Sequence, residues 1–449
     1  MNSGLSSLLR KIVMAMAAVV LFTSSFDIFL VVQAGGNFRL CQLFVPPIFA
    51  VALLRGRRFG FIPTLGLRPL IIWLAFQALF IPNSDFWPKS AGYCLWLALN
   101  AALMFSFVQL YSWREDVVRR LLRFYCYSFA AVAAFGIVQF ALPLLGYGSP
   151  LVEQWWIPGR LARVNGFSYE PSYFATYLLI GSVLIRALRQ NRSDLLSKPE
   201  MRMLSLITTV SIILSSSRMG ILFLLLDLLC YRVAPWLRFL KELLRARLRL
   251  RTLKTLAPSI GWAAGALALV LAIVNFAQNQ PLMFLMFLGG TGVSGATAHS
   301  VVQRQGAFSD TLHVFEQNLF AGRSLGGVSE AIAALHGASI QSFEDSKAYE
   351  GMSVFAEVLA ASGIAGVIPF LWFLVVTFRK PLQAAKRSNA FYSVLLRALV
   401  RALLFTWAIL QFNQNILRPY VWVHLAILAA VYAAAVSVSP RTEEITAHT

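Results

Sequence analysis

Long apolar runs separated by short basic stretches form the main pattern of the chain. Runs such as Ile12–Val32, Leu121–Leu142 and Val354–Phe378 are each long enough to cross a hydrocarbon core of about 30 Å as a helix. These runs do not alternate between apolar and polar residues, as strands of a transmembrane barrel do. Since every backbone amide must be bonded within the lipid, the pattern predicts spanning helices.

This pattern predicts an all-α polytopic membrane protein with about twelve transmembrane helices, in one integral membrane domain over residues 1–449. The first run follows Arg10-Lys11, as in a signal peptide, but it continues past Phe29 without an A-x-A-like cleavage site, so we interpret it as a span. The third span is short and flanked by proline, which favours a tilted or re-entrant segment. The predicted spans are 12–32, 38–54, 69–82, 91–110, 121–143, 171–187, 203–217, 219–234, 256–276, 353–378, 398–413 and 419–438.

Lysine and arginine collect in alternate loops, which predicts the sidedness of the spans. Because cytoplasmic loops carry the excess of basic residues, the basic loops and both termini are expected on the cytoplasmic side. The loops between them contain few basic residues and are expected on the outer face. The basic clusters are Arg55–Arg58, Arg114–Arg123, Arg186–Arg202, Arg232–Lys254 and Arg379–Arg387.

Composition agrees with a membrane protein and argues against a nucleic-acid partner. Hydrophobic residues make up 58% and charged residues 13% of the chain, whereas soluble domains carry about 25% charged residues. The net charge of +20 invites a nucleic-acid interpretation, but the longest basic stretch, Arg232–Lys254, is interleaved with leucine. We expect it to be an amphipathic segment that contacts anionic membrane lipids.

Two loops on the predicted outer face, 144–170 and 277–352, are long enough to carry function. Within the second loop, Ser309–Asn318 and Gly327–Leu335 have helical spacing, and Pro281–Leu288 is apolar but too short to cross the membrane. The sequence Pro281–Leu288 therefore predicts a re-entrant or interfacial piece.

Charged residues at the outer face are the strongest functional candidates, because ionisable groups at membrane depth are costly and tend to be functional. Guanidinium groups match phosphate oxygens, so a cluster of arginines there suits a lipid pyrophosphate and the charge that grows as it leaves. No paired-aspartate motif for a metal occurs on that side, so we expect no metal or other cofactor. The candidate catalytic residues are Arg163, Glu170, Arg218, Arg304, His313, His336 and Glu350, and the candidate substrate-binding residues are Arg160, Tyr169, Asp310 and Arg323.

Several of these residues have an alternative, purely structural interpretation. Arg160 and Arg323 can equally be solvated or anchored to lipid headgroups, and Glu170 can favour the positive end of a helix. His313 and His336 are candidates for a general base. By contrast, His424 lies inside a predicted span, where a packed or hydrogen-bonded role is expected.

Four short motifs in this order resemble the superfamily of O-antigen ligases and Wzy-type polysaccharide polymerases. The resemblance covers about residues 163–366, and the twelve-span pattern with a large late loop extends it over the chain. The motifs are Arg163 before Phe167-x-x-Glu170-Pro171-Ser172, Ser-Ser-Arg218-x-Gly220, Arg304 before Asn-Leu-Phe-x-Gly-x-x-x-Gly, and Ser353-Val-Phe-x-Glu-Val-Leu-x-x-x-Gly363-Ile-Ala-Gly366.

The resemblance implies a metal-independent glycosyltransferase of the GT-C type in the bacterial inner membrane. Such enzymes act at the periplasmic face on oligosaccharides linked to undecaprenyl pyrophosphate, and a chain-length regulator and a flippase are implied partners. Arg163, Arg218 and Arg304 would face the donor pyrophosphate. Glu170 would orient an arginine or form part of the acceptor site.

One departure from the superfamily favours a polymerase over a ligase. The ligases place a histidine about eleven residues before the position of Gly363, where this chain has Met352, which cannot accept a proton. Glu350, His336 or His313 would then be the base. An O-antigen ligase or protein O-oligosaccharyltransferase stays an alternative. A secondary transporter or lipid-glycan flippase is a further one, although acidic residues within spans are scarce apart from Asp27 and Asp227.

Overall fold

The structure, a computed structural model, describes residues 3–33, 37–244, 294–295, 301–412 and 416–438. Seven of its helical segments are long and apolar enough to cross a membrane, so the chain is a multi-pass membrane protein. They are the pair α2 (Leu40–Leu43) and α3 (Val45–Phe59), α5 (Trp87–Tyr111), α6 (Glu115–Leu144), α7 (Pro171–Gln190), α15 (Val354–Arg387), α16 (Ala390–Ile409) and α17 (Pro419–Val438).

Every predicted span within the described residues overlaps a helix, although the bounds differ. Besides the seven segments above, these helices are α1, α4, α8 and α9. The predicted span at 256–276 and the apolar piece at 281–288 lie outside the described residues. The four helices are α1 (Ser3–Thr23), α4 (Leu67–Leu79), α8 (Lys198–Leu214) and α9 (Arg218–Leu244).

The prediction that the first span continues to residue 32 was wrong. Helix α1 ends at Thr23, where the hydroxyls of Thr23 and Ser24 bond back to carbonyls of the last turn. Residues 31–33 instead form strand β1 (Val31–Gln33), which pairs antiparallel with β2 (Asn37–Arg39). Side chains that compete for backbone groups in this way favour helix ends.

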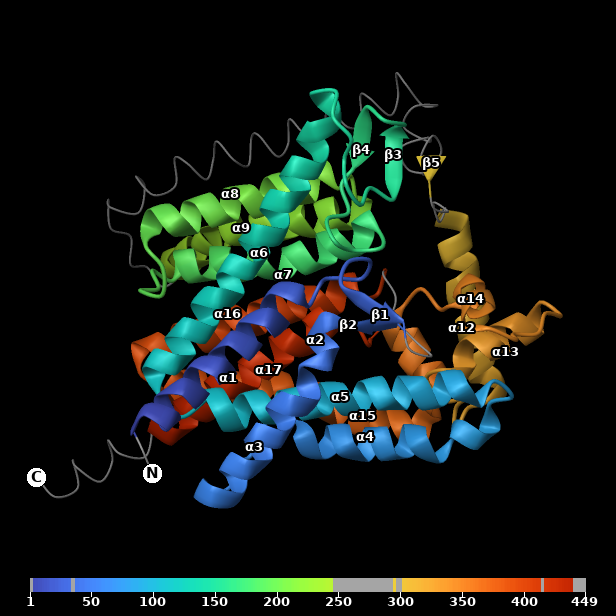
Figure 1. Cartoon of the computed structure of the whole chain (residues 1–449), viewed down its shortest axis with the longest axis horizontal. Coiled ribbons are helices and arrows are strands. Elements are labelled where there is room, and N and C mark those ends of the chain that lie inside the picture. Colours follow the sequence, from blue (N-terminus) through green and yellow to red (C-terminus); the bar gives the residue numbers. More distant parts are fainter. Residues whose placement is uncertain (1–2, 34–36, 245–293, 296–300, 413–415, 439–449) are drawn as a thin grey trace, which may run out of the picture.

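Helices α7 and α17 form the centre of the bundle. Of the best apolar windows, the one in α7 is 94% buried and the one in α17 is 83% buried, against 33% for α2–α3. Helix α17 packs against α5, α15 and α16, and α7 packs against α8, α9 and α16. Helices α4, α5, α7, α8, α9 and α15 run in roughly one direction, and α3 and α6 cross them obliquely (Figure 1). The strands and short helices of the long loops gather at one end of the bundle.

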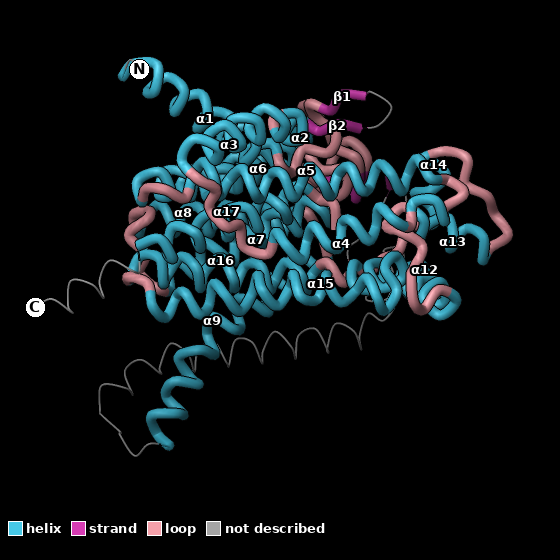
Figure 2. Tube along the Cα trace, turned by 90° about the horizontal axis from the view of Figure 1, so that it is seen from below, coloured by secondary structure: helices cyan, strands magenta, loops and turns pink. Residues whose placement is uncertain are grey.

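That end carries both loops predicted to face outward. Strand β3 lies between β4 and β5, and β5 belongs to the long loop, so the two loops share one sheet. Figure 2 shows α12, α13 and α14 beyond the same end of α4, α5 and α15. The elements are β3 (Gln154–Ile157), β4 (Leu161–Arg163), β5 (Ser294–Gly295), α12 (Val301–Gln317), α13 (Gly327–Leu335), α14 (Phe343–Ser346), and the 3₁₀ turns η1 (Ile81–Asn83) and η2 (Lys347–Tyr349).

The helix predicted at Gly327–Leu335 is confirmed as α13. The helix predicted at Ser309–Asn318 is part of α12, which begins earlier, at Val301. The hydrogen-bonded role expected for His424 is also confirmed, since its ring nitrogens lie 3.0 Å from the Tyr125 hydroxyl and 2.9 Å from the Leu399 carbonyl.

A kink at Gly363 breaks α15 and fastens the long loop to the bundle. Gly363 has φ 59° and ψ −172°, so the helix ladder is interrupted there. Residues 319–324 bond to backbone groups of residues 360–365 that the kink leaves without a partner in the helix. We call this arrangement the clasp. Arg323 and Ser324 donate their N–H groups to the Ala360 and Ala361 carbonyls, and Ile364 and Ala365 donate theirs to the Leu319 and Phe320 carbonyls, at 2.7 to 3.2 Å.

Glycine is required on both sides of the clasp because the two backbones touch. A Cβ atom on Gly363 would overlap the Phe320 carbonyl group, and one on Gly322 would overlap that of Ala361. Both glycines also have positive φ values. The glycines of two motifs that carry the family resemblance therefore have a structural role.

We expect Gly363→Ala to destabilise the protein. The backbone conformation alone costs about 1–3 kcal/mol for a residue with a side chain, and the overlap with Phe320 adds to it. Thermal unfolding of the purified protein in detergent, followed by tryptophan fluorescence, measures the loss. Gly92→Ala in α5 is the matched control, because nothing lies within 4 Å of its added Cβ; equal melting temperatures for the two variants would contradict the clasp.

Candidate functional site

The hairpin of β3 and β4 carries Arg163 to the turn between α8 and α9. Arg163 is the last residue of β4 and lies opposite Gln154 in the register. Its Nη1 atom donates to Gln154 Oε1 at 2.6 Å, and its Nε atom donates to the Ser215 carbonyl at 3.3 Å. The guanidinium group is therefore fixed between the sheet and the turn.

The turn that Arg163 contacts leads directly into α9, which begins at Arg218. Ser216 adopts a positive φ of 52°, which reverses the chain within residues 215–217. The Ser217 hydroxyl accepts from Gly220 N–H at 3.3 Å, as a capping side chain does, and α9 begins at Arg218. The N-terminal end of α9 thus follows directly after the Ser215 carbonyl that Arg163 contacts, and a helix N-terminus favours anions.

The segment that joins β4 to α7 is held rigidly by polar side chains. Gln139 of α6 accepts from the N–H groups of Asn165 and Gly166 through its Oε1 atom. The Asn165 amide donates to the Leu151 and Ser168 carbonyls at 2.9 and 2.7 Å. These bonds determine where Glu170, the residue before α7, is placed.

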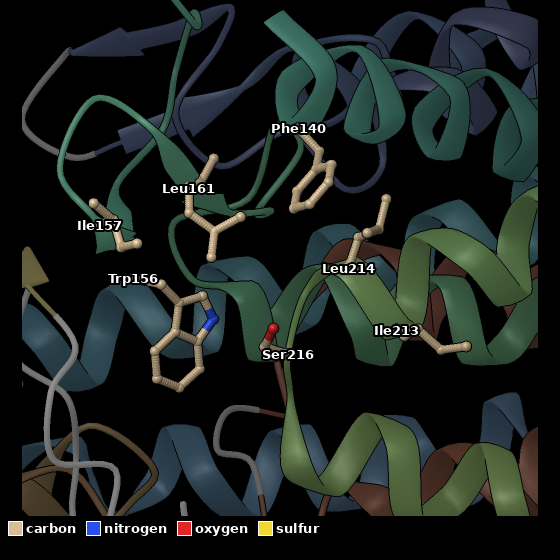
Figure 3. A pocket seen from close by; sticks show the side chains of 8 residues that line it. Phe140, Trp156, Ile157, Leu161, Ile213, Leu214 and Ser216 are labelled. Atoms are coloured by element: carbon tan, nitrogen blue, oxygen red, sulfur yellow. The ribbon is translucent and has the colours of Figure 1, made fainter. Parts of the chain in front are cut away.

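An apolar pocket of about 510 Å³ lies beside Arg163 and the 215–217 turn. Its lining comes from the hairpin and from the ends of α6 and α8, with the Trp156 indole and the Ser216 hydroxyl at one end (Figure 3). Since Ile157 and Ile213 of the lining are about half exposed, the pocket reaches the surface of the bundle. Its lining residues are Phe140, Trp156, Ile157, Leu161, Ala162, Ile213, Leu214 and Ser216.

A second group of charges lies at the end of α1, α7 and α17 that carries the 144–170 loop. Asp27 accepts from Arg39 Nε at 2.8 Å and from Arg418 Nη1 at 2.9 Å, and all three side chains are at least three-quarters buried. The Arg418 guanidinium lies 3.5 Å from the centroid of the Tyr173 ring. Among the described residues, its Nε atom has no hydrogen-bond partner.

Glu170 belongs to this second group rather than to the Arg163 turn. Its Oε2 atom accepts from the Ser172 hydroxyl at 2.9 Å. Burial lowers the pKa of Arg418, but Asp27, two tyrosines and Glu170 raise it more, so the pKa lies above its ordinary value. Glu170 therefore adds to the negative charge that keeps Arg418 ionised.

Glu350 joins the long loop to the start of α5. Its Oε1 atom lies 3.7 Å from Lys89 Nζ and accepts from the Tyr93 hydroxyl at 3.4 Å. Lys89 also donates to the Ser329 hydroxyl at 2.7 Å. Tyr93 interacts electrostatically with Arg418, so this cluster adjoins the Asp27 group.

The other predicted residues lie apart from these three groups of charges. His336 Nε2 lies 2.9 Å from Asp310 Oδ2, and His313 Nδ1 lies 3.2 Å from Glu316 Oε2 on an exposed face of α12. Arg160 lies in the exposed turn of the hairpin, Arg323 belongs to the clasp and donates to the Asn83 carbonyl at 3.4 Å, and the Lys347 ammonium lies 5.8 Å from the Tyr169 ring. Arg304 is in the first turns of α12, and its side chain lies outside the described part.

Our sequence interpretation missed Arg39, Lys89, Glu357 and Arg418. Each is a charged residue within a few positions of the end of a span, on the side that carries the long loops, and this position is the signal that could have identified it. What the sequence does not contain is their pairing, because Asp27 and Arg418 are 391 positions apart.

Comparison with known proteins adds no further constraint. The sequence matches no protein-family model and no curated protein. In the described part of the chain, no three His, Cys, Asp or Glu side chains converge as metal ligands. The function is therefore argued from the turn that Arg163 contacts, the Glu350 cluster and the apolar pocket.

We expect Asp27→Ala to destabilise the protein by about 3–5 kcal/mol, because it leaves two buried arginines without their carboxylate. The free energy of unfolding in mixed detergent micelles measures this change. Asp116→Ala is the control, since that carboxylate pairs with Arg114 and Arg120 at the surface and is expected to cost below about 1 kcal/mol. Similar losses for both variants would show that the Asp27 pairs contribute no more than surface pairs.

Proposed function

We propose that the chain is a metal-independent membrane glycosyltransferase that polymerises lipid-linked polysaccharide repeat units at the outer face of the bacterial inner membrane. The donor would be a glycan on undecaprenyl pyrophosphate, and the acceptor would be the non-reducing end of one repeat unit. A glycan chain would thus grow by transfer from its carrier onto each new unit.

The observation that carries this proposal is the apolar pocket beside the 215–217 turn, where Arg163 contacts the Ser215 carbonyl and α9 begins at Arg218. A polyprenyl pyrophosphate has an apolar chain next to a doubly charged headgroup, and both parts find matching chemistry here. Arginines that are fixed before the reaction stabilise the leaving pyrophosphate without reorganisation. The sheet that joins β5 to β3 adds backbone of the long loop to the same region.

The preference for polymerase over ligase rests on Met352. A thioether cannot take the proton of an attacking hydroxyl, whereas Glu350, two residues earlier, lies in a charged cluster with Lys89 and Tyr93. We therefore assign the base to Glu350. His313, paired with Glu316 on an exposed face of α12, is less suited to this role.

We expect Arg218→Ala and Arg163→Ala cells to lose polymer while single repeat units still reach the outer face. The leaving pyrophosphate would lose a charge-assisted partner, which lowers the rate by about 10²-fold or more. Gel profiles of surface glycan and of carrier-linked glycan measure this effect. Arg202→Ala, on the exposed face of α8, is the matched control and is expected to give normal chain lengths.

Each other outcome of this experiment points to a different function. Long chains that accumulate on the carrier would indicate a ligase or an oligosaccharyltransferase. Normal chain lengths in both arginine variants would contradict glycosyl transfer at this turn and return the transporter or flippase alternative to first place.

A further inference from the structure

Three arginines surround one carboxylate where α7, α9 and α16 meet, at the end of α7 remote from the 144–170 loop. Asp227 is fully buried, and its carboxylate lies 2.5 Å from Arg186 Nε and 2.7 Å from Arg401 Nη2. Arg189, one turn after Arg186 on α7, also interacts electrostatically with Arg186. Positive charge is therefore in excess at a position inside the helical bundle, where unpaired charge is costly.

The corresponding group at the other end of the bundle is balanced. There Asp27 pairs with Arg39 and Arg418, and Glu170 adds its negative charge near Arg418, so two carboxylates meet two arginines. Beside Asp227 the additional charged partner is a third arginine instead of a second carboxylate. The group around Asp227 therefore lacks an anion.

Arg186 also has an unused hydrogen-bond donor. Its side chain is 5% exposed, and its Nη2 atom is buried without a hydrogen-bond partner among the described residues. Its Nε atom donates to Asp227, and its Nη1 atom donates to the Thr209 hydroxyl at 3.1 Å. A buried cationic N–H group without an acceptor is destabilising, so both charge and hydrogen bonding indicate a missing negative partner.

Arg401 is the member of the group that reaches the surface, with 22% of its side chain exposed. It donates to the Gln190 side chain at 3.0 Å and to the carbonyl and carboxylate of Asp227 at 3.3 and 2.7 Å. These contacts use at most three of the five N–H groups of a guanidinium. Because Gln190 is the last residue of α7, Arg401 lies at the level where that helix ends.

The surface around Arg401 changes from basic to apolar along α16. Arg397, Arg401 and Leu404 lie on one face of the helix by their spacing. Arg397 is exposed, and Leu404 is 57% exposed. On α9, Leu226 and Leu229 near Asp227 are 39% and 51% exposed. Guanidinium groups followed by exposed leucines match a phosphate headgroup followed by acyl chains.

We propose that this surface binds the phosphate-bearing headgroup of an anionic phospholipid. Arg401 would bind the phosphate oxygens, with Arg189 and Arg397 beside it and the positive charge of Arg186 behind it. The acyl chains would lie along the exposed leucines of α9 and α16. Inorganic phosphate shares the headgroup chemistry but has no acyl chains, and a zwitterionic lipid brings an ammonium group that the arginines repel. The site is separate from the proposed glycosyl transfer and does not depend on it.

Binding of lipid to the full-length protein, purified in detergent and stripped of lipid, tests this inference. The probes are phosphatidylglycerol, phosphatidylethanolamine with the same acyl chains, and inorganic phosphate. The readouts are the lipid retained in native mass spectrometry and the melting temperature. Phosphatidylglycerol is expected to be retained and to raise the melting temperature by several degrees, because it binds the folded state alone. The other two probes are expected to leave it unchanged.

The decisive variant is the double substitution Arg189→Gln/Arg397→Gln, because neither residue forms an ion pair with Asp227 in the described part of the chain. Its affinity for phosphatidylglycerol is expected to fall by about tenfold or more, since it loses two cationic groups beside the phosphate. Its melting temperature without lipid is expected not to fall. Arg202→Gln, on the exposed face of α8, is the matched control and is expected to bind lipid normally.

Several outcomes would overturn this inference. Equal affinity of the double variant and the control would show that the lipid binds elsewhere. Equal stabilisation by phosphatidylethanolamine would exclude recognition of the anionic headgroup, and equal stabilisation by inorganic phosphate would indicate a site for the free ion. If the double variant does not accumulate, Arg397→Gln alone decides by the same comparison. Arg218→Ala is expected to bind phosphatidylglycerol normally, so failure of the lipid site and failure of the proposed function are distinguishable.

Discussion

Asp227 of α9 is fully buried and lies between two arginines, Arg186 of α7 at 2.5 Å and Arg401 of α16 at 2.7 Å. A charge in a helical bundle inside lipid is tolerated only when it is paired. Since each partner comes from a different helix, the requirement for pairing also determines how these helices pack. The same arrangement recurs at the end of the bundle that carries the long loops, where Asp27 holds Arg39 and Arg418. Each of the two carboxylates thus joins two arginines from different parts of the chain, within or next to the central helices α7 and α17.

The clasp extends this rigid centre to the long loop. It uses backbone groups alone, so it requires glycine where the two chains meet. The Gln77 side chain of α4 bonds to both chains of the clasp: its amide nitrogen donates to the Ser362 hydroxyl at 2.7 Å, and its oxygen accepts from Leu325 N–H at 3.0 Å. Because the loop is fastened at this point, Ser329 and Glu350 on either side of α14 can reach the same lysine. The motifs that contain Gly322 and Gly363 therefore act through the backbone, and their effect on the candidate site is indirect.

Hydropathy and the distribution of basic residues predicted the helices and the position of both long loops at one end of the bundle, where they share a sheet, because apolar length and charge asymmetry are local properties. They did not predict where the first helix ends, since the hydroxyls of Thr23 and Ser24 compete for carbonyls within a run that is still apolar. Nor did they predict the kink at Gly363, which lies inside a continuous apolar stretch. Of the candidate site, the arginines before and within the turns were identifiable, but Lys89 was not, because its partners are more than two hundred positions away.

The two charged clusters differ in the way that donor and acceptor chemistry would require. Around Arg163 and Arg218 the surroundings are a helix N-terminus and an apolar pocket, which suit an anion that is attached to a lipid. Around Glu350 the surroundings are a lysine, a tyrosine and a second carboxylate, which suit proton transfer from a hydroxyl group. Arg418 connects the Glu350 cluster to the start of α7 through Tyr173. Helix α7 follows directly from the segment that begins at Arg163. One segment of the chain, anchored by Gln139, therefore leads from Arg163 to the residues that contact Arg418.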